Sequence, residues 1–250
     1  MLTEERRARI VEIVNEKKAV SVNELIELLD TSAATIRRDI SALDRSRKLI
    51  KVFGGATALS SRDVDTKEDA VKMKARKNVQ EKDSISKFAA ELIEDDDFVY
   101  IDAGTTTLAM IDYLTNHNAK YITNGVVHAR RLMDKGFETI MIGGRLKAST
   151  EAAVGPDCVE FIRKYHFTKA FMGTNGISVH AGFTTPDVDE AMIKTAAIEH
   201  AYRSYVLADH TKFNKVNSVT FADIKECSII TDRLTAKEYV NHTEVLICCK

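Results

Sequence analysis

No stretch of the 250-residue sequence approaches the roughly 18 uncharged apolar residues that a helix needs to cross a bilayer. The amino-terminal segment MLTEERRARI also lacks an apolar core, because acids and arginines stand where a signal peptide has apolar residues. We therefore expect a cytoplasmic protein without a membrane span.

Cysteine is scarce, and its spacing carries no metal-binding pattern. The sequence has no C-x-x-C pair and no histidine at ligand spacing from its four cysteines, which are Cys158, Cys227, Cys248 and Cys249. Ordinary buried thiols are therefore expected. We predict no metal site and no cofactor.

The sequence also has little net charge and little proline. Its formal net charge is −1, so a polyanionic partner would have to bind a local patch. It contains only two prolines and neither an internal repeat nor a low-complexity tract. A chain of this length with 44% hydrophobic residues is typical of a globular protein, and two domains are favoured.

The beginning of the chain predicts three helices. Apolar residues at helical spacing indicate a first helix over about residues 3–17. Ser21, with Glu24 three residues later, forms a capping box for a short second helix. Thr31 or Ser32 caps a third.

A hairpin is predicted to follow the third helix. The apolar segment 49–53, the pair Gly54-Gly55 and the segment 56–58 indicate a strand, a tight turn and a second strand. Three helices followed by a hairpin is the layout of a winged helix-turn-helix, and we place this domain at residues 1–58.

The third helix has a face suited to DNA. Its core side is Ile36, Ile40 and Leu43, and a helical turn of about 100° per residue puts Ala34, Arg38, Ser41 and Arg45 on the opposite side. Small residues allow close approach to the major groove, and arginine forks bind guanine edges or phosphates. An ordinary solvated helix face is the alternative.

The surrounding charge favours DNA. Residues 31–55 contain six bases, Arg37, Arg38, Arg45, Arg47, Lys48 and Lys51, but only two acids, Asp39 and Asp44. Hydroxyls near the start of the helix can bind phosphates. The predicted contacts with DNA are Ser32, Ala34, Thr35, Arg37, Arg38, Ser41, Arg45 and Lys51.

The rest of the chain alternates apolar runs with helical stretches. Residues 59–83 are highly charged and are interpreted as a linker, and a domain follows at 84–250. The linker passes into a helix that becomes amphipathic at Ile85, Phe88, Ala89, Leu92 and Ile93. Strands are expected at 98–102, 121–123, 138–144, 169–174, 204–209, 227–232 and 244–249. Helices are expected near 106–116, 126–135, 156–165, 187–202 and 235–241. This alternation predicts an α/β domain with a mostly parallel sheet covered on both faces.

One loop of this domain resembles a phosphate cradle. The segment YIDAGTTTLAM ends a strand at Asp102, turns at Gly104 and offers the hydroxyls of Thr105, Thr106 and Thr107 before a helix begins. A helix N-terminus binds anions through its free N–H groups and its dipole. Simple capping of the helix is the equally weighted alternative.

Further loops at the carboxyl ends of strands favour a ligand site, because open α/β sheets bind ligands at that edge. Lys212 and Arg145 are candidate cations for phosphate. Lys194 is a weaker candidate, since it could pair with Glu190 at i, i+4. The candidate contacts outside the cradle are Asn124, Gly144, Arg145, Thr174, Asn175, Gly176 and Lys212.

Both parts of the chain resemble the DeoR family of bacterial transcription regulators. VNELIELLDTSAATIRRDISALDRSRKLIKVFGGAT resembles the family's N-terminal domain, and DAGTT, GTNGI, GFTTPDVDEAMIK and ADHTKF resemble its effector domain. The resemblance implies an effector domain similar in fold to ribose-5-phosphate isomerase and a phosphorylated sugar as effector. The FTTPD loop is most like fructose-operon repressors, which implies fructose 1-phosphate.

The leading hypothesis is thus a repressor that a sugar phosphate releases from operator DNA. One alternative is a sugar-phosphate isomerase with a DNA-binding appendage, for which Asp102 or Glu190 would be the general base. Another is a structural nucleoid protein. Because one recognition helix buries little surface, we expect a homodimer or homotetramer on symmetric half-sites.

Overall fold

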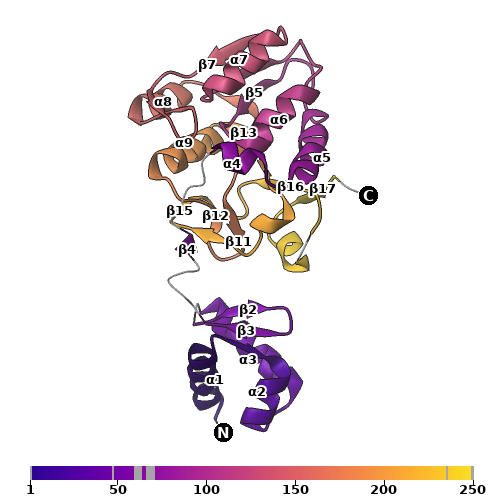
Figure 1. Cartoon of the computed structure of the whole chain (residues 1–250), viewed down its shortest axis with the longest axis vertical. Helices are drawn as coiled ribbons and strands as arrows, with labels where there is room; N and C mark the ends of the chain where they lie inside the picture. The colour runs from indigo at the N-terminus through magenta and orange to yellow at the C-terminus, as the bar shows by residue number, and fades with distance from the viewer. Residues whose placement is uncertain (1, 47, 59–63, 66–70, 235, 249–250) are drawn as a thin grey trace. The chain divides into compact units, whose positions relative to one another are not determined.

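The computed structural model describes residues 2–46, 48–58, 64–65, 71–234 and 236–248. The chain forms two compact units, Met1–Asp63 and Val64–Lys250 (Figure 1). Within the described residues, no helix combines the length and the apolar character needed to cross a membrane.

The first unit is a winged helix-turn-helix, as predicted. Its three short strands form an antiparallel sheet in the order β1-β3-β2. The first of these strands was not predicted from the sequence. The elements are α1 (Thr3–Lys17), β1 (Ala19–Ser21), α2 (Val22–Leu29), α3 (Ala33–Arg45), β2 (Ile50–Val52) and β3 (Gly55–Thr57).

The predicted capping and core of this unit are confirmed. Ser21 Oγ accepts a hydrogen bond from the Glu24 backbone at 3.1 Å, which starts α2. The predicted core side of α3 is fully buried, with Ile36, Ile40 and Leu43 at most 3% exposed. The helix periodicity therefore placed the opposite side of α3 correctly.

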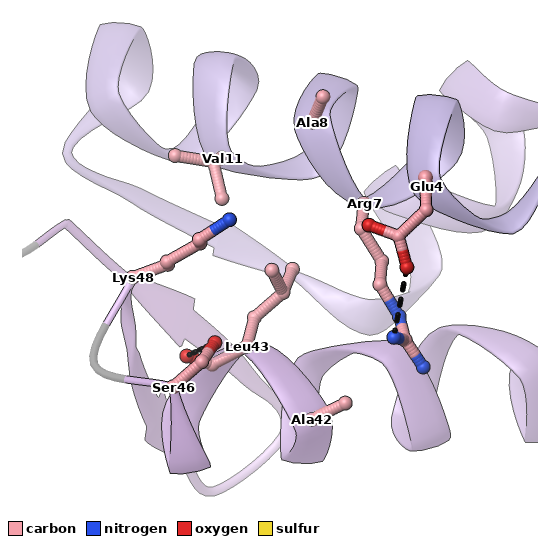
Figure 2. Close-up of a pocket in the computed structure, with 8 residues that line it drawn as sticks. All are labelled: Glu4, Arg7, Ala8, Val11, Ala42, Leu43, Ser46 and Lys48. Carbon is pink, nitrogen blue, oxygen red and sulfur yellow. Dashed lines mark hydrogen bonds and ion pairs between the residues drawn. The ribbon is translucent and has the colours of Figure 1, made fainter.

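A buried carboxylate joins α1 to α3. Asp39 accepts hydrogen bonds from Arg6 Nε at 2.7 Å and from Arg7 Nε at 3.0 Å. Arg7 also pairs with Glu4, at the end of a groove of about 580 Å³ between the two helices (Figure 2). Asp39 thus fixes the orientation of α3 from the side that faces the core.

The second unit contains a seven-stranded parallel sheet in the order β17-β16-β13-β10-β5-β6-β7. Each of its strands lies within or beside a predicted one. They are β5 (Phe98–Ile101), β6 (Lys120–Thr123), β7 (Thr139–Met141), β10 (Phe167–Gly173), β13 (Ala201–Leu207), β16 (Ser228–Thr231) and β17 (Val245–Ile247).

Helices cover both faces of this sheet (Figure 1). Alternate strand residues point to opposite faces, so Val99 and Ile101 pack with one cluster and Tyr100 with the other. The first face packs against α5 (Val79–Ala90), α6 (Thr105–Tyr113) and α7 (Val126–Asp134). The second packs against α8 (Pro156–Ile162), α9 (Val188–Glu199) and Tyr239, which lies in the 3₁₀ helix η2 (Lys237–Asn241).

Small sheets that the sequence analysis missed complete the unit. They are β8 (Arg145–Lys147) with β9 (Ala152–Val154), β11 (Gly176–Ser178) with β12 (Gly182–Thr185) and β15 (Val219–Ala222), and β4 (Val64–Asp65) with β14 (Val216–Asn217). The segment expected near 235–241 is the 3₁₀ helix η2 rather than an α-helix. Cys158, Cys227 and Cys248 are free thiols, and Cys249 lies outside the described residues.

The predicted linker at 59–83 differs from what the structure shows. Its described part contains β4, the short helix α4 (Val71–Ala75) and the beginning of α5. Residues 59–63 and 66–70 lie outside the described residues. The high charge of the segment concealed α4 and the first turn of α5, since neither shows an apolar stripe of its own.

Candidate functional site

The predicted DNA-binding side of α3 begins at a capped N-terminus. Ser32 Oγ accepts a hydrogen bond from the Thr35 backbone at 3.3 Å, and the two hydroxyls lie 2.9 Å apart. Ser32 is thus the cap, one of the two residues that the sequence offered for that role. Both hydroxyls stand at the positive end of the helix, where phosphates bind.

The side chains of the predicted row lie along the helix surface. Ala34, Arg37, Arg38 and Arg45 are exposed, and Ser41 is half-buried. Arg38 Nε donates to the Ala34 carbonyl at 3.3 Å, and Arg45 Nε donates to the Ser41 carbonyl at 3.2 Å. The remaining guanidinium nitrogens can still bind bases or phosphates.

The two acids of this segment do not stand on that row. Asp39 is buried against α1, and Asp44 accepts a hydrogen bond from the Lys51 backbone at 2.9 Å, which fastens the wing to α3. The exposed face therefore keeps the positive charge of its arginines. Arg47, which the sequence analysis counted among the bases, lies outside the described residues.

The topology of the second unit has one point at the sheet edge where the order of the strands reverses. From β5 the chain proceeds to β6 and β7 on one side, and β10, β13, β16 and β17 follow on the other. The order thus reverses between β5 and β10, and open α/β sheets bind ligands at such a switch point. Asp102 follows β5, and Thr174 follows β10.

Asp102 connects the two strands at the switch point. Its Oδ2 accepts a hydrogen bond from the Gly173 backbone at 2.9 Å and forms an ion pair with Lys194 of α9. Both charged side chains are buried. The alternative partner for Lys194, Glu190, is instead bound by Lys147 at 3.0 Å. Lys194 therefore belongs to the switch point, which corrects the local pairing considered from the sequence.

Two of the predicted contacts are occupied within the protein. The Thr107 hydroxyl bonds to the Asp102 and Gly104 carbonyls. Asn124 Oδ1 accepts from Tyr100 and from the Ala103 backbone, while its Nδ2 donates to the Ala153 carbonyl. Their side chains shape the loop, whereas the first N–H groups of α6 have no acceptor within their own helix.

His128, which the sequence analysis did not select, supports the same loop. Its Nε2 lies 2.9 Å from the Gly104 carbonyl and 3.3 Å from Thr107 Oγ1. Burial lowers the pKa of His128 from 6.5 to about 4. The imidazole is therefore neutral at pH 7 and donates Nε2–H to Gly104.

This pKa shift predicts a pH-dependent stability. Between pH 4 and 6.5 this histidine is protonated in the unfolded chain but neutral in the folded one. The free energy of unfolding therefore falls as the pH drops. We expect the pKa shift of His128 to lower the free energy of unfolding by about 3 kcal/mol when the pH falls from 7 to 4. Urea unfolding of wild type and His128→Gln at both pH values measures this. Equal losses in the two proteins would contradict the assignment.

A cluster of lysines lies beside this loop. Burial lowers the pKa of Lys82, the positive charges of Lys212, Lys74 and Lys77 lower it further, and Asp209 partly offsets them. Burial and neighbouring lysines lower the pKa of Lys212 in the same way. Mutual repulsion in a partly desolvated place is relieved when an anion binds.

Two contacts bring this cluster to the start of α6. Asn78 Nδ2 donates to Asp209 Oδ1 at 3.0 Å, which fastens the beginning of α5 to the loop that carries Lys212. Buried Ser86 of α5 donates to the Thr106 carbonyl at 2.8 Å. Lys82 lies one turn before Ser86 on the same side of α5, and its Nζ donates a hydrogen bond to the Lys74 carbonyl of α4.

The sequence contained one signal for this lysine. Lys82 occupies the apolar stripe of its helix, three residues before Ile85 and seven before Ala89. A buried lysine on such a stripe needs a partner. The assignment of 59–83 to a linker concealed it, and only Lys212 was predicted.

The remaining candidates lie in nearby loops with different partners. Thr174 Oγ1 donates to the Gly176 carbonyl at 2.9 Å, and Thr185 Oγ1 donates to Asn175 Oδ1 at 3.4 Å. Arg145 is exposed and forms an ion pair with Asp189.

The predicted glycines among them serve close packing. A Cβ at Gly176 would come within 2.5 Å of the Lys215 carbonyl, and one at Gly144 within 2.9 Å of the Val154 carbonyl. Both positions therefore admit only glycine without a shift of the backbone.

His210 has metal-ligand neighbours but is already engaged. Its ligand atoms lie within 4.8 Å of those of Glu81 and Asp232. However, Nδ1 bonds to Asp232 at 2.8 Å, and Arg233 lies 2.7 Å from Nε2. A guanidinium at that nitrogen opposes a cation, so His210 forms a hydrogen-bonded link between Asp232 and Arg233.

A winged helix with a basic exposed face, followed in one chain by an α/β unit with a lysine-rich switch point, defines a DNA-binding regulator with a sensor domain. The chain belongs to the DeoR family. Residues 6–62 match the DeoR-like helix-turn-helix domain, and residues 77–233 match the DeoR C terminal sensor domain.

Named relatives extend over nearly the whole chain. The uncharacterized HTH-type transcriptional regulator FruR of Bacillus subtilis is 41% identical over 99% of both chains. The lactose phosphotransferase system repressor of Staphylococcus aureus is 33% identical over 90% of both chains. Among solved structures, ribose 5-phosphate isomerase A of Methanocaldococcus jannaschii matches 54% of this chain and 55% of its own, with 15% identity and a TM-score of 0.39.

Proposed function

We propose that this regulator represses a sugar-utilisation operon and leaves its operator when a phosphorylated sugar binds at the switch point. The observation that carries the proposal is the mutual repulsion of Lys82 and Lys212, which burial strengthens. Both lysines lie on elements tied to the start of α6. The names of the relatives, a regulator FruR and a repressor of a lactose phosphotransferase system, agree with it.

In this proposal the site has a phosphate end and a sugar end. Lys82, Lys212 and the N–H groups of Thr105 and Thr106 bind the phosphate. Asp102, Thr174 and Asn175 lie across the switch point and bind sugar hydroxyls. Fructose 1-phosphate is the effector that we propose.

The connection to the DNA-binding unit starts near the same lysine. Strand β14 begins at Val216, four residues after Lys212, and pairs in parallel with β4 at Val64–Asp65. Since β4 is the first element of the second unit, phosphate binding at Lys212 acts on the segment that leads to the winged helix. The effector must bind the DNA-free arrangement better, because otherwise it shifts no equilibrium.

The same contacts support a binding role over an isomerase. The two carboxylates considered as general bases, Asp102 and Glu190, are bound by Lys194 and Lys147. The relatives above are named as regulators and a repressor. We further propose a homodimer or homotetramer on double-stranded DNA with two-fold symmetry.

A ligand panel tests the proposal. The wild-type chain first selects a duplex from a random pool (the selected duplex), and its affinity is measured by fluorescence anisotropy. We expect fructose 1-phosphate to lower that affinity 5- to 150-fold, on the order of ordinary allosteric coupling, and fructose 6-phosphate and tagatose 6-phosphate to act less. The effector assignment fails if no member of the panel changes the affinity.

A further inference from the structure

Phe53 stands at the tip of the wing with its ring fully in water. Its relative exposure is 109%, and that of the preceding Val52 is 42%. Isolated apolar side chains are common on protein surfaces. Here the two are consecutive, with Val52 at the end of β2 and Phe53 in the turn of the hairpin that follows α3.

The wing holds this ring in a fixed place. The Val22 backbone donates a hydrogen bond to the Gly54 carbonyl at 2.8 Å, and the Lys51 backbone donates to Asp44 at 2.9 Å. Gly54 has a φ of +80°, and a Cβ at Gly55 would lie 2.1 Å from the Val20 carbonyl. The turn is therefore tied to α2 on one side and to α3 on the other, with glycines that its geometry requires.

The residues around the ring indicate what kind of partner it binds. Lys51 is exposed in β2, two residues before the ring, so a positive charge accompanies the apolar tip. Double-stranded DNA presents phosphates at the rim of each groove and apolar base surfaces inside it. The bond between Asp44 and Lys51 joins this tip to the helix that carries Arg38.

We propose that Phe53 is a wedge that enters a groove of the bound duplex and packs against the bases. The inference rests on the proposed DNA-binding role. Apolar side chains that insert at base steps unstack them partly and kink the duplex. Phe53 contributes affinity through contact with bases, whereas Lys51 contributes through phosphate.

Measurements of affinity and of its salt dependence distinguish a contact of Phe53 with bases from a contact of lysine with phosphates. Phe53→Ala should bind the selected duplex about tenfold more weakly, in line with the loss of one base–aromatic contact. The slope of log affinity against log salt should stay unchanged, because no charge is removed. Phe53→Leu should retain part of the affinity. The melting temperature of Phe53→Ala should match wild type, because a ring that is 109% exposed makes no packing contact that its removal could break.

The sequence offers a direct probe, because it has no tryptophan. In Phe53→Trp the only indole stands at the wing tip, and stacking on bases quenches its fluorescence. Tyr202→Trp is the matched control, since Tyr202 is 88% exposed on the other unit. We expect the selected duplex to quench the first protein at least twofold and to leave the second within the scatter of the measurement.

Two results would overturn the wedge. One is an unchanged emission of Phe53→Trp with saturating duplex while wild type binds normally, which leaves the proposed function intact. The other is equal quenching in both variants, which would assign the signal to DNA in general. Failure of the wild-type chain to select any duplex would overturn the proposed function together with the wedge.

Discussion

Replacing Lys82 and Lys212 together by methionine is expected to weaken sugar-phosphate binding by at least about 100-fold and to leave DNA binding intact. A hydrogen bond to a charged group contributes about 1.5–3 kcal/mol, and two such contacts to phosphate are removed. Methionine keeps the length of the side chain without its charge. Calorimetric titration with fructose 1-phosphate measures the loss, and anisotropy on the selected duplex measures DNA binding.

The stability of this double variant separates a binding role from a structural one. Burial and like-charge repulsion lower the pKa of both lysines, so their charges oppose folding when no anion is bound. We therefore expect an unfolding free energy equal to wild type or higher. Lys120→Met, which removes an exposed lysine paired with Glu138 at 3.3 Å, is the control. Wild-type sugar-phosphate affinity in the double variant would contradict the phosphate site.

Replacing Arg38 by alanine is expected to reduce sequence discrimination about 10- to 100-fold. Arg38 stands opposite the buried row of Ile36, Ile40 and Leu43, at the centre of the exposed side. One good bidentate contact with a base contributes about 1–3 kcal/mol of discrimination. The affinity for the selected duplex should fall about 10- to 100-fold, while the affinity for random duplex stays nearly constant.

Lys51→Ala is the matched comparison, because its side chain lies on the wing and its backbone bond to Asp44 is retained. It should weaken both duplexes alike and reduce the salt slope by about one phosphate contact. Arg38 would lose its assignment as a base contact if Arg38→Ala reduced both affinities by the same factor. Electrophoretic mobility shifts over a salt series measure the affinity of each of the two variants for the selected and the random duplex.

Sequence periodicity predicted the elements that bury a continuous face. The three helices of the winged domain and the seven strands of the main sheet follow from apolar patterns and caps. Three-residue strands such as β7 and β17 lie in apolar runs and were predicted, whereas β1 at Ala19–Ser21 and β8 at Arg145–Lys147 have charged or polar neighbours and no such run. Such strands form because tertiary contacts supply their partners.

The candidate site was predicted at the level of loops more than of side chains. The rule for strand ends placed Asp102 and Thr174 at one edge, and the order of strands puts them at the switch point. The Lys194–Asp102 pair spans 92 residues, so local spacing pointed instead to Glu190. Thr107 was expected to face a ligand, yet its hydroxyl bonds within its own loop, an outcome that residue type alone does not reveal.

The most direct test of the coupling between the two units is its reciprocity. The affinity for the selected duplex is measured with and without saturating fructose 1-phosphate, and the affinity for fructose 1-phosphate with and without saturating duplex. Linkage requires the two factors to be equal when one chain carries both sites. We expect each ligand to weaken the other by the same factor, between about 5 and 150. A sugar phosphate that binds with unchanged affinity to the free and the DNA-bound chain would contradict the proposed repressor.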